Sequence, residues 1–231
     1  MYDINFRGVK GTSLGVYVVK RPSIPAPVYA REDLIIPGRD GIIQGETRIE
    51  KLEIPVELNF MASKSDMWNQ DFRKAKSWLL GKGGRLEFSD DEDYYLKVYY
   101  VDISEVERTS RRLCNFTAVF SCDPYMYLKS GDREYDLADV EYNPYEVAHP
   151  TYILRGYSEG TILNVNGFEL TMAVDGTLIV DTDRQQAYDE NGVLRNTSVI
   201  GDYASLYLQS GHNDLSVSTG GLTVIPNWRS L

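Results

Sequence analysis

One amphipathic helical segment, residues 65–80, most limits the folds that this sequence can adopt. In almost every other patterned stretch, apolar and polar residues alternate as they do in a β-strand. At 100° per residue its apolar side chains fall within roughly 60° of one another, and the opposite side of the helix is polar. The stripe consists of Trp68, Phe72, Ala75 and Leu79. A single amphipathic helix in a β-rich chain has to cover a sheet, so this stripe predicts the centre of a first hydrophobic core.

The residues around the helix predict where it begins and ends. Ser63 or Ser65 can accept a hydrogen bond from the amides of the first turn, as an N-cap does. Gly81 follows the last apolar residue and is expected to end the helix in the left-handed conformation. A turn through two further glycines then leads into a strand at residues 85–88.

Before and after the helix, apolar and polar residues alternate with the period of half-buried strands. The expected strands are residues 2–6, 14–20, 52–60, 85–88, 94–103 and 113–122. Pro55 lies within the strongest of these and cannot donate to a ladder, which indicates a sheet edge or a bulge. Residues 1–130 are therefore predicted to form a β-rich domain with one α-helix.

A second domain follows a stretch where the pattern lapses. Residues 131–149 are polar and acidic, and we interpret them as a linker. Residues 150–231 consist of short alternating runs without a helical period, which is typical of a β-sandwich. Hairpins are predicted at Asn166-Gly167, Asp175-Gly176 and Gly220-Gly221. The fold class is thus mainly β, and we expect residues 151–231 to fold alone as a monomer.

The two cysteines, Cys114 and Cys122, lie on one expected strand. Eight residues of extended chain separate their Cα atoms by about 26 Å, whereas a disulfide needs them within about 7 Å. Their even spacing places both on the face that carries Phe116, Ala118 and Phe120. We therefore expect two buried thiols.

Composition excludes several classes of function. The chain has 34 acidic against 24 basic residues in a length of 231, and phosphate backbones require clustered Lys and Arg. We therefore expect no specific nucleic-acid binding. No apolar run has the length that crosses a bilayer, so no membrane insertion is expected, and the N-terminal residues carry no secretory signal.

No residue is assigned to catalysis, to a cofactor or to a metal. His149 and His212, the only histidines, stand far apart in sequence, and P-loop and dinucleotide fingerprints are absent. The acidic run at residues 90–93 lacks the spaced glycine and terminal glutamate of a calcium loop, so we interpret it as a solvated turn. Asp181 and Asp183 are assigned to a polar strand face. The prediction is a protein that is not an enzyme.

Several motifs, taken in order, resemble one protein family. In the first half they are I-P-G-R-D-G at residues 36–41, W-L-L-G-K-G-G-R-L-E-F at 78–88 and N-F-T-A-V-F-S-C-D-P-Y at 115–125. In the second half they are H-P-T-Y-I-L-R-G at 149–156, L-N-V-N-G at 163–167, L-I-V-D-T-D-R-Q-Q-A-Y at 178–188 and P-N-W-R-S-L at 226–231. Together they cover nearly the whole chain, which resembles the distal tail proteins of siphophages, bacteriophages with long non-contractile tails.

The resemblance implies a structural hub of the virion, located at the tail tip and assembled in the bacterial host cytoplasm. It implies a homohexameric ring, or belt, of N-terminal domains that joins the tail tube protein to a tail-tip or tail-associated lysin-type protein while DNA passes through. It also implies a galectin-like C-terminal sandwich and contact with a receptor-binding protein. The chain has no room for the inserted carbohydrate-binding modules of larger relatives.

An alternative function is a lectin-like carbohydrate-binding module of a receptor-binding apparatus, because galectin-like sandwiches can bind sugars through an aromatic platform. Tyr207 and Trp228 are the candidate stacking residues. Trp228 directly precedes the last three residues and follows a proline by two positions, so we expect it to cover the core instead.

The candidate subunit interface lies at the end of a proline-stiffened extended segment. Pro22, Pro25 and Pro27 hold this segment away from a central ladder. The interface residues are Leu34, Ile35, Ile36, Pro37, Gly38, Arg39, Asp40 and Gly41. An apolar tip beside Pro-Gly needs a surface to cover it, and in a closed ring the next protomer supplies that surface through a heterologous contact.

The double substitution Ile35→Asp and Ile36→Asp should abolish the ring, because burying two unpaired carboxylates is strongly unfavourable. The monomer should keep its melting transition, since the arm contributes little to either core. Light scattering coupled to size exclusion measures the outcome, and hexamers formed by the double variant would contradict it.

Overall fold

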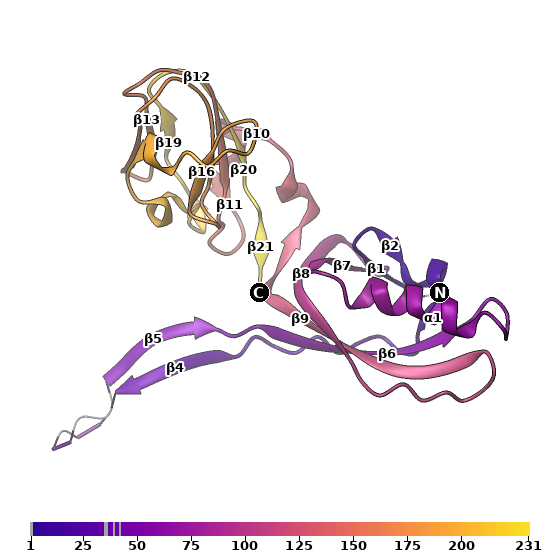
Figure 1. The fold of residues 1–231 in the computed structure, drawn as a ribbon. Helices are drawn as coiled ribbons and strands as arrows, with labels where there is room; N and C mark the ends of the chain where they lie inside the picture. The colour runs from indigo at the N-terminus through magenta and orange to yellow at the C-terminus, as the bar shows by residue number, and fades with distance from the viewer. Residues whose placement is uncertain (1, 35–36, 39, 42) are drawn as a thin grey trace. The chain divides into compact units, whose positions relative to one another are not determined.

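The chain is mainly β, as predicted, and forms two compact units in a computed structural model that describes residues 2–34, 37–38, 40–41 and 43–231 (Figure 1). The first unit comprises residues 1–126 together with Leu231, and the second comprises residues 127–230. Neither α1 nor α2, the helices of the described chain, has the length and apolar character to cross a bilayer.

The first unit is built on a sheet with the strand order β2-β1-β7-β8-β9-β6-β3. Its strands are β1 (Ile4–Phe6), β2 (Val9–Lys10), β3 (Val16–Val18), β6 (Leu52–Met61), β7 (Gly84–Phe88), β8 (Asp91–Ile103) and β9 (Leu113–Leu128). β6 and β9 pair antiparallel without a register shift, from Leu52 opposite Cys122 to Met61 opposite Leu113. On its other side β6 pairs with β3 only at residues 58–60, so within the described chain Pro55 lies beyond that ladder, at a local edge as predicted.

The helix α1 (Trp68–Leu79) packs on this sheet through the predicted stripe. Ala75 and Leu79 are buried, and Trp68 and Phe72 pack against the same core. The Phe72 ring meets Phe60 edge to face at 5.2 Å between centroids, a favourable aromatic geometry. The prediction that the stripe forms the first core is therefore confirmed.

The start of α1 differs from the prediction. The N-cap is Met67, whose side chain makes no capping hydrogen bond, and the helix begins at Trp68. Ser63 instead donates to Asp71 within the first turn, from its hydroxyl at 2.6 Å and from its amide at 3.1 Å. The predicted serine cap was wrong because the serine donates to a carboxylate of the first turn instead of accepting from the amides of that turn. These hydrogen bonds lower the pKa of Asp71.

The end of α1 also differs. Gly81 does not have a positive φ, so it is not a left-handed cap. A Cβ at Gly81 would lie 1.9 Å from Nη1 of Arg7, which donates to the carbonyl of Trp78 at 3.3 Å. The small residue leaves room for the guanidinium of Arg7 beside the carbonyl end of the helix, where positive charge is favourable.

The second unit contains two antiparallel sheets, with the orders β10-β20-β12-β15-β16 and β17-β14-β13-β19, and a short pair β11-β18. The bounds are β10 (Tyr135–Asp136), β11 (Tyr142–Asn143), β12 (Thr151–Tyr157), β13 (Ile162–Val165), β14 (Phe168–Met172), β15 (Gly176–Asp181), β16 (Gln186–Tyr188), β17 (Val199–Ile200), β18 (Gly211–His212), β19 (Leu215–Val217), β20 (Gly221–Ile225) and β21 (Arg229–Ser230). Tyr152 of the first sheet donates its hydroxyl to the carbonyl of Leu206, in a 3₁₀ turn that contacts β13 and β14 of the second. The two sheets therefore enclose one core, as in a sandwich.

Only one of the three predicted hairpins forms. Asn166 and Gly167 have φ values of 53° and 86° and join β13 to β14, as a two-residue turn with positive φ at both positions requires. Asp175-Gly176 and Gly220-Gly221 instead connect strands of different sheets, β14 to β15 and β19 to β20. Those predictions were wrong because a turn pair reverses the chain without fixing which strand becomes the partner.

Residues 131–149, interpreted from the sequence as a linker, lie inside the second unit. They contain β10, which pairs with β20, the short helix α2 (Leu137–Val140), and β11, which pairs with β18. Val140 and Asn143 are fully buried there. Short elements of two to four residues carry too little periodicity to be recognised in the sequence.

Cys114 and Cys122 are unpaired and buried on β9, beside Phe116, Ala118 and Phe120, as predicted. Burial raises the pKa of Cys122 to about 12. Since the thiolate is the reactive form, this thiol is inert at neutral pH.

A chain that starts at Tyr127 should fold by itself, whereas a chain that starts at Glu146 should melt about 10 °C lower or more. The shorter chain lacks β10, α2, β11 and the buried residues that they contribute. Circular dichroism melting of both chains tests this. Equal melting temperatures would show that residues 127–145 contribute no stability to the second unit.

Candidate functional site: the β4–β5 arm

The described residues of the predicted interface lie at the end of a separate hairpin, which we call the arm. It consists of β4 (Tyr29–Leu34) and β5 (Ile43–Ile49) with the preceding residues 21–28 (Figure 1). β4 and β5 form a two-stranded antiparallel sheet of their own, with Tyr29 opposite Ile49 and Leu34 opposite Ile43. A two-stranded hairpin without further support is marginally stable in water.

The arm exposes a series of apolar side chains. Val28 is 59% exposed, Leu34 is 57% exposed and Tyr29 is 49% exposed, and Ile24 is also exposed. Single exposed apolar residues are ordinary, but several on one narrow element are typical of an interaction surface. A groove lined by Pro25, Val28, Arg48, Ile49 and Leu52 lies at the base of the same element.

The described part of the predicted interface agrees with an exposed tip. Leu34 is the last residue of β4, and Pro37, Gly38, Asp40 and Gly41 are exposed. Gly38 and Gly41 have φ values of 84° and 85°, as expected for a turn. Ile35, Ile36 and Arg39 lie outside the described residues. The interface assignment therefore stays a prediction.

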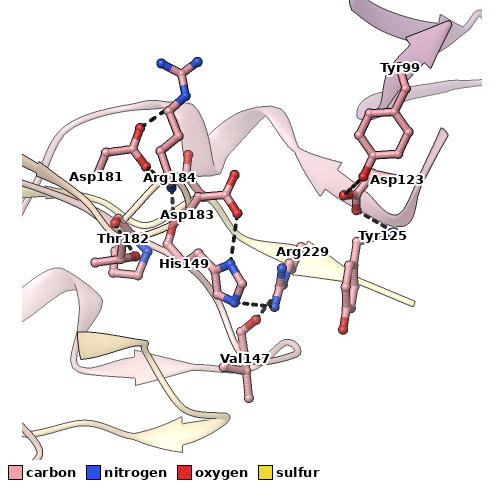
Figure 2. A network of polar contacts seen from close by, with 12 residues as sticks. Tyr99, Asp123, Tyr125, Val147, His149, Asp181, Thr182, Asp183, Arg184 and Arg229 are labelled. Carbon is pink, nitrogen blue, oxygen red and sulfur yellow. Dashed lines mark hydrogen bonds and ion pairs between the residues drawn. The ribbon is translucent and has the colours of Figure 1, made fainter. Parts of the chain in front are cut away.

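A second polar arrangement, around His149, resembles part of a catalytic site. His149 Nδ1 lies 2.9 Å from Oδ1 of Asp183, and its Nε2 lies 2.9 Å from Nη2 of Arg229 (Figure 2). Arg229 also donates through Nε to the carbonyl of Val147 at 2.6 Å. The ring of His149 stacks on Tyr207, with centroids 3.9 Å apart.

This arrangement closes the imidazole to general-base chemistry. A guanidinium can only donate, so Nε2 of His149 accepts from Arg229 and Nδ1 carries the proton donated to Asp183. A nucleophile activated by His149 would need the position that Arg229 occupies. The group therefore acts as a clasp that fastens the chain before β12 to the chain at β21. Sequence reasoning missed it because 80 residues separate His149 from Arg229 and no local pattern links them.

The other candidate site residues are also held in structural roles. Asp181 Oδ1 accepts the amide of Arg184 at 3.0 Å, and Asp90 lies in the turn between β7 and β8, 3.3 Å from Nε of Arg21. Among the described residues, no three His, Cys, Asp or Glu side chains form a cluster that could hold a metal ion. Trp228 is buried and one face of Tyr207 is covered by His149, so these two do not form an open stacking platform.

Comparison with known proteins gives a fold but no sequence family. No family model and no curated protein matches the chain. Among solved structures, the crystal structure of the SPP1 Dit protein (gp 19.1), described as a paradigm of the hub adsorption apparatus in phages that infect Gram-positive bacteria, has a TM-score of 0.65. The alignment covers 97% of each chain at 13% identity. The two chains share a fold.

A chain of the phage P2 baseplate in its activated conformation with Ca is less similar, with a TM-score of 0.49 and 11% identity. That alignment covers 100% of this chain and 97% of the baseplate chain. A second phage p2 baseplate structure, with Sr, gives a TM-score of 0.46 at 12% identity.

Substituting Arg229→Ala should destabilise the second unit by about 2–4 kcal/mol, because it leaves the Val147 carbonyl and His149 Nε2 without their donor. The measurement is urea unfolding of the chain 127–231, in which Trp228 is the only tryptophan and reports by fluorescence. The control is Arg155→Ala, which removes an exposed ion pair with Glu134 and should cost about 1 kcal/mol or less. Equal losses from both substitutions would contradict the clasp.

Proposed function

We propose that this chain is a structural hub protein of a bacteriophage tail, located in the virion where the tail tip or baseplate assembles. The observation that carries the proposal is the fold shared with SPP1 Dit along 97% of both chains, because the likeness includes both units. The ordered sequence motifs also support it, because they depend on the residues alone and not on the fold.

In the finer form of the proposal, six copies form a ring in a long non-contractile tail, between the tube and the tail-tip proteins. The arm supports an assembly role, because its hairpin has little packing of its own and exposes Val28, Tyr29 and Leu34. The net charge of −10 is favourable for a ring around a DNA path, since an acidic lumen repels phosphates and lets the duplex slide.

The proposed role is structural and not catalytic. The imidazole of His149, paired with Asp183, faces Arg229 instead of a nucleophile, and no His, Cys, Asp and Glu side chains of the described residues form a cluster that could hold a metal ion. These features support a protein that acts through its surfaces, with other tail proteins as partners.

The double substitution Val28→Asp and Leu34→Asp should prevent oligomers while leaving the melting transition unchanged, because both side chains are more than half exposed in the single chain. The matched control is Leu194→Asp with Ile200→Asp, which are 59% and 67% exposed on the second unit. Light scattering coupled to size exclusion, with negative-stain microscopy of the wild type, measures assembly and ring symmetry. A wild-type chain that stays monomeric with tail partners present would overturn the ring, and so would assembly by the arm variant.

A further inference from the structure

The dipeptide Asn-Gly occurs twice in the sequence, at Asn166-Gly167 and Asn191-Gly192, and both copies lie at turns of the second unit. This dipeptide is chemically labile. The backbone nitrogen that follows an asparagine can attack the side-chain carboxamide, and a glycine at that position has no Cβ to hinder the approach. Since the local sequence is the same, the surroundings of each copy decide how fast it reacts.

The carboxamide of Asn166 is held at both of its ends. Its Oδ1 accepts from the amide of Asp214 at 2.8 Å, and its Nδ2 donates to Oδ1 of Asn213 at 2.9 Å. Asn213 is only 3% exposed and is itself fixed, because it donates to the carbonyls of Gln209 and Gly211. An attack on the carboxamide of Asn166 would break both of its hydrogen bonds, so the fold protects this copy.

The carboxamide of Asn191 is held by nothing in the part of the chain that the structure describes. Asn191 is exposed in the turn of residues 189–193, between β16 and β17. It takes part in this turn through its backbone amide, which donates to Oδ1 of Asp189 at 3.0 Å. The amide of Asp189 donates to the carbonyl of Val193 at 3.0 Å and closes the turn. The backbone is therefore ordered while the carboxamide can rotate toward it.

The attacking nitrogen does not distinguish the two copies, because it is hydrogen-bonded in both. The amide of Gly192 donates to the carbonyl of Asp189 at 2.9 Å, and the amide of Gly167 donates to Oδ1 of Asn164 at 3.1 Å. Both glycines are exposed, and hydrogen bonds in exposed turns open at a low cost in free energy. The difference between the copies therefore lies in the asparagine side chain.

We propose that Asn191 is a site of spontaneous deamidation in the folded protein, and that Asn166 is protected from it. The nitrogen of Gly192 forms a bond to Cγ of Asn191 and the bond from Cγ to Nδ2 breaks. The proton of that nitrogen ends on the departing ammonia. Water then opens the succinimide ring at either carbonyl and gives aspartate or isoaspartate, without any oxidation or reduction. The inference does not depend on the hub role, because it concerns one turn of one unit.

The modification changes the turn that Asp189 holds together. Oδ1 of Asp189 accepts the amides of both Asn191 and Val193, each at 3.0 Å, and Oδ2 accepts from Nη2 of Arg195 at 3.0 Å. Isoaspartate adds a methylene to the backbone between those two amides, so they cannot keep their present spacing. Either product also adds a negative charge next to Glu190. The site is thus a slow chemical change confined to an exposed loop.

Peptide mapping by mass spectrometry tests the proposal, after incubation of the full chain at mildly alkaline pH, where more of the attacking amide is deprotonated. Deamidation of Asn191 should be about tenfold faster than that of Asn166, or more, because the hydrogen bonds of the Asn166 carboxamide must break first. In urea the two rates should agree within about twofold, since unfolding removes the protection. Equal rates in the folded chain, faster loss at Asn166, or an intact Asn191 while the unfolded chain reacts would each overturn the proposal.

Two substitutions connect the rates to the structure. Asn191→Gln keeps a carboxamide but requires a larger ring, so deamidation at this position should stop while Asn166 keeps its rate. Asn213→Ala removes the acceptor of the Asn166 carboxamide and should accelerate deamidation of Asn166 about threefold or more without changing Asn191. Circular dichroism melting identifies the temperature range in which this variant is folded. An unchanged rate at Asn166 in the folded variant would contradict the assigned protection.

Discussion

The pairing of β6 with β9 is the constraint on which the first unit depends. Ten successive residue pairs hold one register, and alternate residues of both strands point into a single core. A slip by one residue would move every apolar side chain of β6 to the outer face. The helix α1 can bury its stripe only on this face, and the indole N–H of Trp78 fastens it by donating to the carbonyl of Phe6 at 2.9 Å.

The sequence was sufficient for features that depend on local periodicity or sterics. The stripe of α1, the alternation of β6, the buried cysteines of β9 and the Asn166-Gly167 turn all follow from spacing within a few residues. The failures concern long-range partners. Gly81 has the sequence of a left-handed helix cap but has no positive φ and lies beside Arg7, and Asp175-Gly176 has the sequence of a hairpin but connects two sheets.

The contrast between local patterns and long-range partners also applies to the arm and to the arrangement around His149. An extended segment with an apolar tip could be inferred because three prolines and that tip lie close together in sequence, whereas β4 and β5 of the arm were not predicted. The clasp of His149 and Arg229 could not be inferred, since it joins segments 80 residues apart.

The arm differs in kind from the other exposed apolar residues. Ile200 is 67% exposed, but its strand β17 pairs with β14, whose Leu170 and Met172 are buried, so the fold orders it without a partner. Among the described residues, β4 and β5 of the arm pair only with each other, and ordering their thirteen residues costs conformational entropy that no core of their own offsets. A contact that covers Val28, Tyr29 and Leu34 would supply the missing burial. Assembly would therefore complete this element, which is the physical reason why we propose that the subunit contact lies in the arm.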